Sequence, residues 1–192
     1  DWIGFSDAGV LHTVDTKGIV RACLRSYGFE WLPVLDANTA KKSKAEHHFV
    51  VGVQENHLMC VLCKGDDKFP STLPRPISTP IPLAMPVACT MDLPNKGLES
   101  ERLLASVMLN ECRAGAMDDG IDDHPSVQEA LLKDTTKVDV QIIKLVAEAC
   151  KAERNARALD LVMQLQLPKS LKNALTLANH YKMGELADRI SR

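Results

Sequence analysis

The sequence predicts a two-part fold, with a β-rich first half followed by an all-helical second half. Short apolar and β-branched runs separated by turn residues occupy residues 1–90. Apolar residues recur at helical spacing over 98–192. Seven of the ten prolines lie between residues 69 and 96, where they rule out a central strand and mark the boundary. We therefore expect β-structure over 1–90, a linker over 91–97 and a helical bundle over 98–192.

About six or seven short strands are predicted in the first half, at the spacing typical of a sandwich, a barrel or a propeller. The runs are Trp2–Phe5, Val10–Val14, Ile19–Leu24, Trp31–Leu35, Phe49–Val53, Leu58–Leu62 and an edge strand at Ile81–Val87. This number is close to two propeller blades of four strands each. Two blades alone leave unpaired edge strands, so we infer that the rest of a propeller lies outside this chain or that these edges pair in trans.

The second half is predicted to hold several helices of modest length. Leu98–Ala114 has one apolar face, and Gly115 suits the residue that ends a helix. A further helix is expected to begin at 124–126 and to bend near 135–136. Three or four short helices follow between Val138 and Ile190, with Pro168 in a first turn and a break at Met183-Gly184. Such helices need tertiary packing to be stable.

Catalytic and cofactor motifs do not occur in the sequence, which has no glycine-rich phosphate loop, nucleophile elbow or zinc-protease motif. Cys60-x-x-Cys63 is a single potential zinc pair, but residues three apart in a strand point to opposite faces. The acidic run 118–123 has the wrong spacing for calcium and is interpreted as a solvated loop. We therefore expect no enzyme activity, no metal and no cofactor.

Charge and composition narrow the class of protein further. The net charge of −2 argues against general binding to nucleic acid or anionic membranes. No apolar run approaches the ~20 residues that span a bilayer. The six cysteines are widely spread, which favours reduced thiols in the nucleus or cytosol. The start at Asp1-Trp2 has no basic signal region and no initiator methionine, which indicates a fragment.

The helical half is basic although the whole chain is slightly acidic. Residues 144–182 carry seven basic and three acidic side chains, a local balance of +4. Small alanines recur at helical spacing in the same stretch. One interpretation is that the alanines are ordinary helix formers and the basic residues solvate an outer face. The other is a groove that binds an acidic amphipathic helix, with a basic rim that steers the encounter.

An ordered set of short motifs resembles a known family. The motifs are Trp2-Ile3-Gly4-Phe5-Ser6, Val14-Asp15, Gly18-Ile19-Val20-Arg21, Trp31-x-Pro33, Val50-Val51-Gly52-Val53, Cys63-Lys64-Gly65 and Leu73-Pro74-Arg75-Pro76. With the helices that follow, they resemble the SepB domain of eukaryotic replisome adaptors. These are the DNA-polymerase-α-binding proteins of the chromosome-transmission-fidelity and acidic-nucleoplasmic-DNA-binding type.

The resemblance implies the last blades of a six-bladed β-propeller followed by a helical bundle, assembled as a homotrimer. It implies a nuclear, non-enzymatic scaffold in DNA replication and sister chromatid cohesion. Such a scaffold tethers the replicative helicase, through GINS, to the catalytic subunit of DNA polymerase α–primase. Clients present short acidic and hydrophobic helices to the bundle. Direct DNA binding stays open.

The family's docking site is carried over by position onto two helical stripes. Leu145 and Ala149 form one i, i+4 pair, and Ala174 and Ala178 form the other. The residues expected to pair with client carboxylates are Lys144, Lys151 and Arg157. The alternative function is a protein-interaction or self-assembly module of a propeller protein unrelated to replication.

Overall fold

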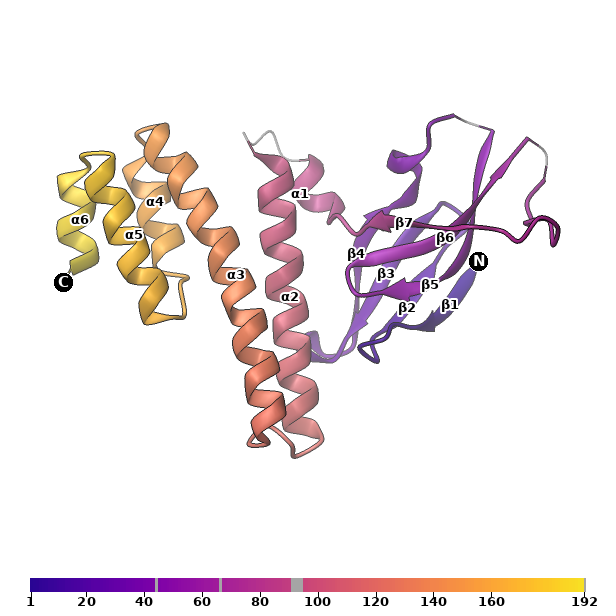
Figure 1. Ribbon diagram of the computed structural model, residues 1–192, viewed down its shortest axis with the longest axis horizontal. Coiled ribbons are helices and arrows are strands. Elements are labelled where there is room, and N and C mark those ends of the chain that lie inside the picture. Colours follow the sequence, from indigo (N-terminus) through magenta and orange to yellow (C-terminus); the bar gives the residue numbers. More distant parts are fainter. Residues whose placement is uncertain (44, 66, 91–94, 192) are drawn as a thin grey trace. The chain divides into compact units, whose positions relative to one another are not determined.

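The computed structural model describes residues 1–43, 45–65, 67–90 and 95–191, and divides the chain into two compact units, Asp1–Thr90 and Met91–Arg192. The first unit holds antiparallel β-sheets and the second holds helices (Figure 1). Helix α2 begins inside the predicted 91–97 linker, of which residues 91–94 lie outside the described residues. Among the described residues, no helix combines the length and the apolar character needed to cross a bilayer.

The first sheet is a four-stranded antiparallel meander. Its strands are β1 (Trp2–Phe5), β2 (Leu11–Val14), β3 (Ile19–Leu24) and β4 (Glu30–Asp36), paired in that order. Strand β3 alternates in burial, with Val20, Ala22 and Leu24 fully buried, because successive side chains of a strand point to opposite faces. The predicted strands of this region are therefore present, and no end is shifted by more than one residue.

The turn between β2 and β3 is fixed by one carboxylate. Asp15 Oδ1 accepts hydrogen bonds from the N–H groups of Lys17 and Ile19, each at 2.9 Å. Its Oδ2 accepts a hydrogen bond from Arg21 at 2.7 Å. The Arg21 side chain and these N–H groups lower the pKa of Asp15. Gly18 has a φ of 77°, a conformation that glycine adopts without a side-chain penalty.

The second sheet has three strands, β5 (Glu46–Gln54), β6 (His57–Lys64) and β7 (Ser78–Pro82), paired in that order. Leu58 and Cys60 of β6 and Ile81 of β7 are buried on its inner face. The predicted edge strand Ile81–Val87 is wrong in its extent. Strand β7 ends at Pro82, and the short helix α1 (Pro86–Thr90) follows, because proline suits the first turn of a helix.

Prolines occupy the free edge of β7. The N–H of Leu83, directly after β7, donates to the Asn56 carbonyl at 2.8 Å. Because strand residues alternate in direction, every second residue back from Leu83 turns its backbone groups toward β6. Pro80 and Pro82 are the intervening residues, and their nitrogens lie on the side away from β6. The free edge therefore loses donors without any cost to the β6–β7 ladder.

The two sheets contact each other, but one outer face stays open. Strands β1 and β5 lie side by side, and the Asp7 carboxylate accepts the Glu55 N–H at 3.0 and 3.1 Å. The outer face of the first sheet carries Ile3, Phe5 and Trp31, which are 65%, 69% and 42% exposed. The structure thus confirms the antiparallel sheets followed by helices, while the described sheets do not themselves close into a propeller.

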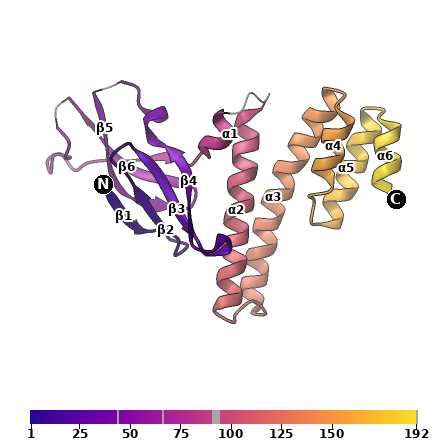
Figure 2. The same ribbon diagram turned by 180° about the vertical axis from the view of Figure 1, so that it is seen from behind.

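The second unit begins with a long antiparallel helical hairpin, α2 (Lys96–Asp118) and α3 (Pro125–Lys151), seen from both sides in Figures 1 and 2. Helix α2 runs through Gly115, which was expected to end it. Helix α3 is one element from residue 125 onward and continues past residues 135 and 136. The hydroxyls of Thr135 and Thr136 donate to carbonyls four residues earlier, at 2.7 and 2.8 Å, so both find partners within the helix.

Three short helices complete the unit, α4 (Asn155–Val162), α5 (Pro168–His180) and α6 (Gly184–Ser191). Pro168 and Gly184 begin α5 and α6, as the sequence predicts. The α4–α5 loop is tied to α3 because the buried Asp139 carboxylate accepts the N–H groups of Gln166 and Leu167, at 3.1 and 3.0 Å. The apolar faces of α3, α4, α5 and α6 form one continuous core.

Helices α2, α3 and α5 end in the same way. In each, a residue with positive φ follows the helix, and the next N–H reaches back to a carbonyl five residues earlier. The residues with positive φ are Gly120 (64°), Glu153 (55°) and Lys182 (57°). The bonds run from Ile121 to Ala116 at 3.0 Å, from Arg154 to Ala149 at 2.9 Å and from Met183 to Ala178 at 2.9 Å. In all three helices the accepting carbonyl belongs to a buried alanine.

Candidate functional site

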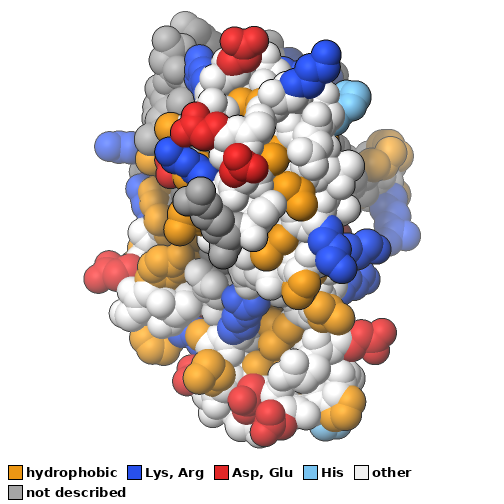
Figure 3. Space-filling model, turned by 90° about the vertical axis from the view of Figure 1, so that its left-hand side faces the viewer, with side chains coloured by type: hydrophobic (Ala, Val, Ile, Leu, Met, Phe, Trp, Pro, Cys, Tyr) orange, Lys and Arg blue, Asp and Glu red, His pale blue; other side chains and the backbone are white. Residues whose placement is uncertain are grey.

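The four apolar residues predicted to bind clients do not form one surface. Ala174 and Ala178 are 0% exposed and lie in the core, so the structure does not present them as an accessible stripe. Their short side chains let α5 pack closely on α3 and α6. Seen from the α6 side, surface hydrophobic side chains are interspersed with charged and uncharged ones (Figure 3). Leu145 and Ala149 belong to the same core, at 5% and 7% exposed, but both also line a pocket.

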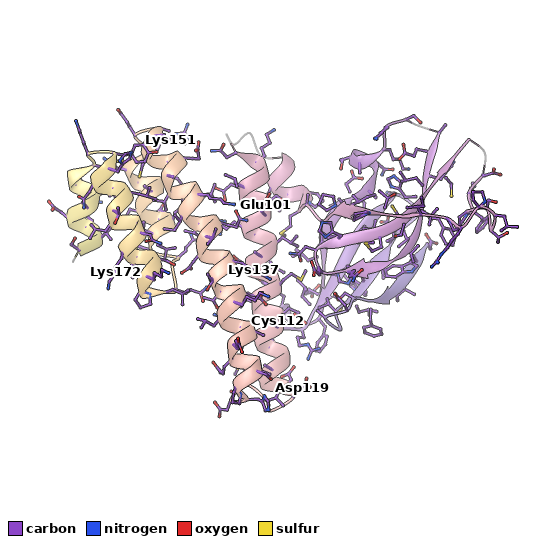
Figure 4. The ribbon with its side chains drawn as sticks, viewed as in Figure 1. Glu101, Cys112, Asp119, Lys137, Lys151 and Lys172 are labelled. Carbon is purple, nitrogen blue, oxygen red and sulfur yellow. The ribbon has the colours of Figure 1, made fainter. Side chains whose placement is uncertain are left out.

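This pocket, here called the junction pocket, lies where α2 begins, α3 ends and α4 begins. Its volume is about 280 Å³. Leu145, Ala149 and Leu161 supply apolar surface, and the exposed Ala152 lies at its edge. The basic residues that line it are Lys151, Arg154 and Arg157, and the other polar residues are Asn95, Glu99 and Glu148. Figure 4 shows Lys151 at the end of α3.

Ion pairs fix most of the charged groups around the junction pocket. The buried Glu99 carboxylate of α2 lies between Arg102, at 3.2 Å, and Arg157 of α4, and so links two helices. Lys151 pairs with Glu148 at 2.6 Å, which raises the pKa of Lys151. Arg154 forms no ion pair within the described part of the chain. Arg154 is therefore the cation most available to a carboxylate that arrives from outside.

Sequence reasoning placed two of its three basic residues at the pocket and missed other lining residues. Lys151 and Arg157 line it, whereas Lys144 is exposed elsewhere on α3. Arg154 was missed because its position depends on the turn at Glu153, whose positive φ the sequence does not signal. Glu99 was missed because it comes from a distant helix. A carboxylate in the first turn of α2 was visible, but its arginine partners were not.

The cysteine pair does not gather metal ligands in the described structure. Cys60 faces Thr79 and Val50 across the sheet, and Cys63 pairs with His47 on the opposite face. This alternation is the one expected for a strand. Burial raises the pKa of the Cys60 thiol to about 11, which keeps it protonated. Within the described residues, no group of three or more His, Cys, Asp or Glu side chains is placed to hold a metal ion.

An apolar pocket with a charged rim on a rigid helical scaffold is typical of a protein-binding module. Comparison with known proteins agrees with this class. Residues 1–87 match the family described as the middle region of minichromosome loss protein Mcl1. Residues 97–192 match the family described as the C-terminal domain of DNA polymerase alpha-binding protein Ctf4. The junction pocket falls almost wholly within the second match.

Similar proteins align along nearly the whole chain. Protein ENHANCER OF LHP1 1 of Arabidopsis thaliana is 34% identical over 99% of this chain and 20% of its own length. WD repeat and HMG-box DNA-binding protein 1 of Homo sapiens is 31% identical over 99% of this chain and 16% of its own length. Minichromosome loss protein 1 of Schizosaccharomyces pombe is 27% identical over 97% of this chain and 23% of its own length. This chain thus spans about a fifth of the length of these relatives.

The chain belongs to the Ctf4 and Mcl1 family of DNA polymerase alpha-binding proteins. This membership confirms the resemblance seen in the ordered motifs of the sequence. The family is non-catalytic, which confirms the expectation that the chain is not an enzyme.

Proposed function

We propose that this chain is the client-binding part of a nuclear replisome adaptor, and that the junction pocket receives short acidic and hydrophobic helices. One observation carries the proposal. The pocket combines an apolar surface at Leu145 and Ala149 with a basic rim, and it lies in the unit that matches the polymerase alpha-binding domain. Ala174 and Ala178 support that surface from the core instead of touching the client.

The size and charge of the pocket suit an anchored peptide. At about 280 Å³ it is smaller than most small-molecule sites and fits individual side chains of a docked helix. Apolar anchors supply affinity in this mode of recognition, and basic residues on the rim accelerate the encounter and set the register. Client carboxylates would pair first with Arg154, since Arg157 and Lys151 already have carboxylate partners.

The clients proposed are the catalytic subunit of DNA polymerase α and a GINS subunit of the replicative helicase. A homotrimer would present three junction pockets, so that weak single contacts add up through effective concentration. One assembly could then hold a helicase and a polymerase together during replication and in sister chromatid cohesion. Sedimentation of the longer protein, alone and with a client peptide, tests the trimer.

Two exposed alanines give a matched test of the junction pocket. Ala152 lines the pocket and Ala156 does not, although both are exposed. Ala152→Phe fills the pocket edge without burying a charge and should weaken binding of a polymerase α or GINS peptide by roughly tenfold or more. Ala156→Phe should bind as the wild type does. Fluorescence anisotropy measures both, and equal affinity of Ala152→Phe and wild type would refute the site.

We extend the proposal to the first unit, whose two sheets would be neighbouring blades of a propeller completed in a longer polypeptide. Phe5, Leu11, Cys23 and Trp31 face one another across all four strands of the first sheet, in a row that another blade would cover. Phe5→Glu should leave this chain stable but should destabilise the longer protein. Equal melting shifts in both would refute the packing.

A further inference from the structure

Helix α3 has a second ordered face, on the side opposite its core residues. The residues on this face follow one another in steps of four, three, four, three and four. We call this face the lysine seam, and it consists of Lys133, Lys137, Val140, Lys144, Ala147 and Lys151. The four lysines are exposed, Val140 is 48% exposed and Ala147 is half-buried. Figure 4 shows Lys137 midway along α3 and Lys151 at its end. Alternating three- and four-residue steps form the stripe along which a second helix can lie.

Charge on the lysine seam is only partly neutralised. Lys137 pairs with Asp134 at 2.8 Å and Lys151 with Glu148 at 2.6 Å. Lys133 and Lys144 form no ion pair with any residue that the structure describes. A shallow, open depression on the α3 surface lies beside Lys133, Lys137 and Val140. The surface therefore offers net positive charge around a small apolar contact.

We infer that the lysine seam binds an acidic α-helix, with carboxylates at three- and four-residue spacing and a small apolar residue against Val140. The inference rests on the proposed function, because Lys151 belongs both to the seam and to the junction pocket. One client segment then places its apolar anchors in the pocket and runs its acidic helix along α3 toward Lys133. Lys151 lies eighteen positions after Lys133 along α3, so this helix is about 27 Å, or about five turns, long.

A helix fits the lysine seam better than a nucleic acid does. Val140 lies in the middle of the seam, where an anionic phosphate gains nothing from an apolar side chain. The net charge of the chain is −2, whereas domains that track phosphates are strongly basic. The lysine spacing follows helical repeats, which a partner helix matches.

Two client peptides test the inference on the full chain. One carries only the apolar anchor segment, and the other adds an acidic helix of about five turns. The longer peptide should bind wild type roughly tenfold more tightly at low salt, and this advantage should shrink as salt increases. Lys133→Gln/Lys137→Gln should abolish the advantage and leave the short peptide unaffected. Lys169→Gln/Lys172→Gln, which removes the same charge from exposed positions of α5, should keep the advantage.

Charge exchange gives a second, independent readout. Lys133→Glu/Lys137→Glu should weaken the long peptide further, and a peptide with lysines at the two facing carboxylates should restore its binding. The inference is overturned if the long peptide keeps its advantage with Lys133→Gln/Lys137→Gln. It is also overturned if duplex DNA binds instead and loses affinity with that variant. If the short peptide binds and the acidic extension adds no affinity, the lysine seam is refuted while the junction pocket still stands. If neither peptide binds, the seam and the proposed function both fail.

Discussion

Replacing Ala178 by glutamate measures whether this position is core or surface. Ala178 is 0% exposed, and α5 packs there against α3 and α6. The longer side chain would overpack the site at a cost of about 1–3 kcal/mol. Burying its carboxylate, or keeping it protonated, costs about 3 kcal/mol or more. The free energy of unfolding should therefore fall by at least about 4 kcal/mol, a large share of the roughly 5–15 kcal/mol that stabilises a typical domain.

The assay is thermal unfolding of the full chain, followed by the helical circular dichroism signal. For a unit of about 100 residues, this loss corresponds to a fall in Tm of roughly 15 °C or more. Ala156→Glu is the matched control, because Ala156 is exposed, and it should change stability by about 0.5 kcal/mol or less. If Ala178→Glu matched this control in stability and yet lost client binding, Ala178 would be a surface residue and the burial argument would be wrong.

Asp139→Asn should lower the free energy of unfolding by about 2 kcal/mol, because one backbone N–H of the α4–α5 loop then faces an amide donor. An unchanged urea unfolding curve would contradict this role of the Asp139 carboxylate. Glu153→Gly should raise Tm by relieving a positive φ, worth about 1 kcal/mol, and Gly120→Ala should lower it by a similar amount. Burial lowers the pKa of His12 below its usual 6.5, so the unfolded chain takes up this proton first and stability declines as pH falls from about 6.5 through the folded pKa. His12→Gln should flatten that decline below about pH 6.5, and an unchanged slope would assign it to other groups.

Periodicity located most secondary structure, because alternation in strands and three- to four-residue steps in helices are local properties. The strand at Ile19–Leu24 and the helix starts at Pro168 and Gly184 were predicted from the sequence. The errors arose where two local signals compete. Gly115 was expected to end α2, but the left-handed conformation that ends this helix occurs at Gly120. Which of these glycines ends the helix is decided only by how the α2–α3 hairpin packs.

The candidate site was harder to predict because burial and pairing are tertiary properties. Leu145 and Ala149 share a spacing with Ala174 and Ala178, yet only the first pair lines the junction pocket. Spacing identifies one face of a helix but not which neighbour covers that face. The Glu99–Arg157 pair joins residues 58 positions apart, which no window of sequence connects. Charge counting indicated a basic region but could not separate paired from available cations.

The prolines of β7 determine how that strand can meet other chains. Its free edge offers carbonyl acceptors at Pro80 and Pro82 but no N–H at these positions. If two copies of this edge met, the carbonyl acceptors of one would face those of the other at these positions. Identical molecules therefore cannot form a continuous hydrogen-bonded β-ladder there. The strand thus resists stacking into fibrils, while a different segment with donors in the right register can still attach.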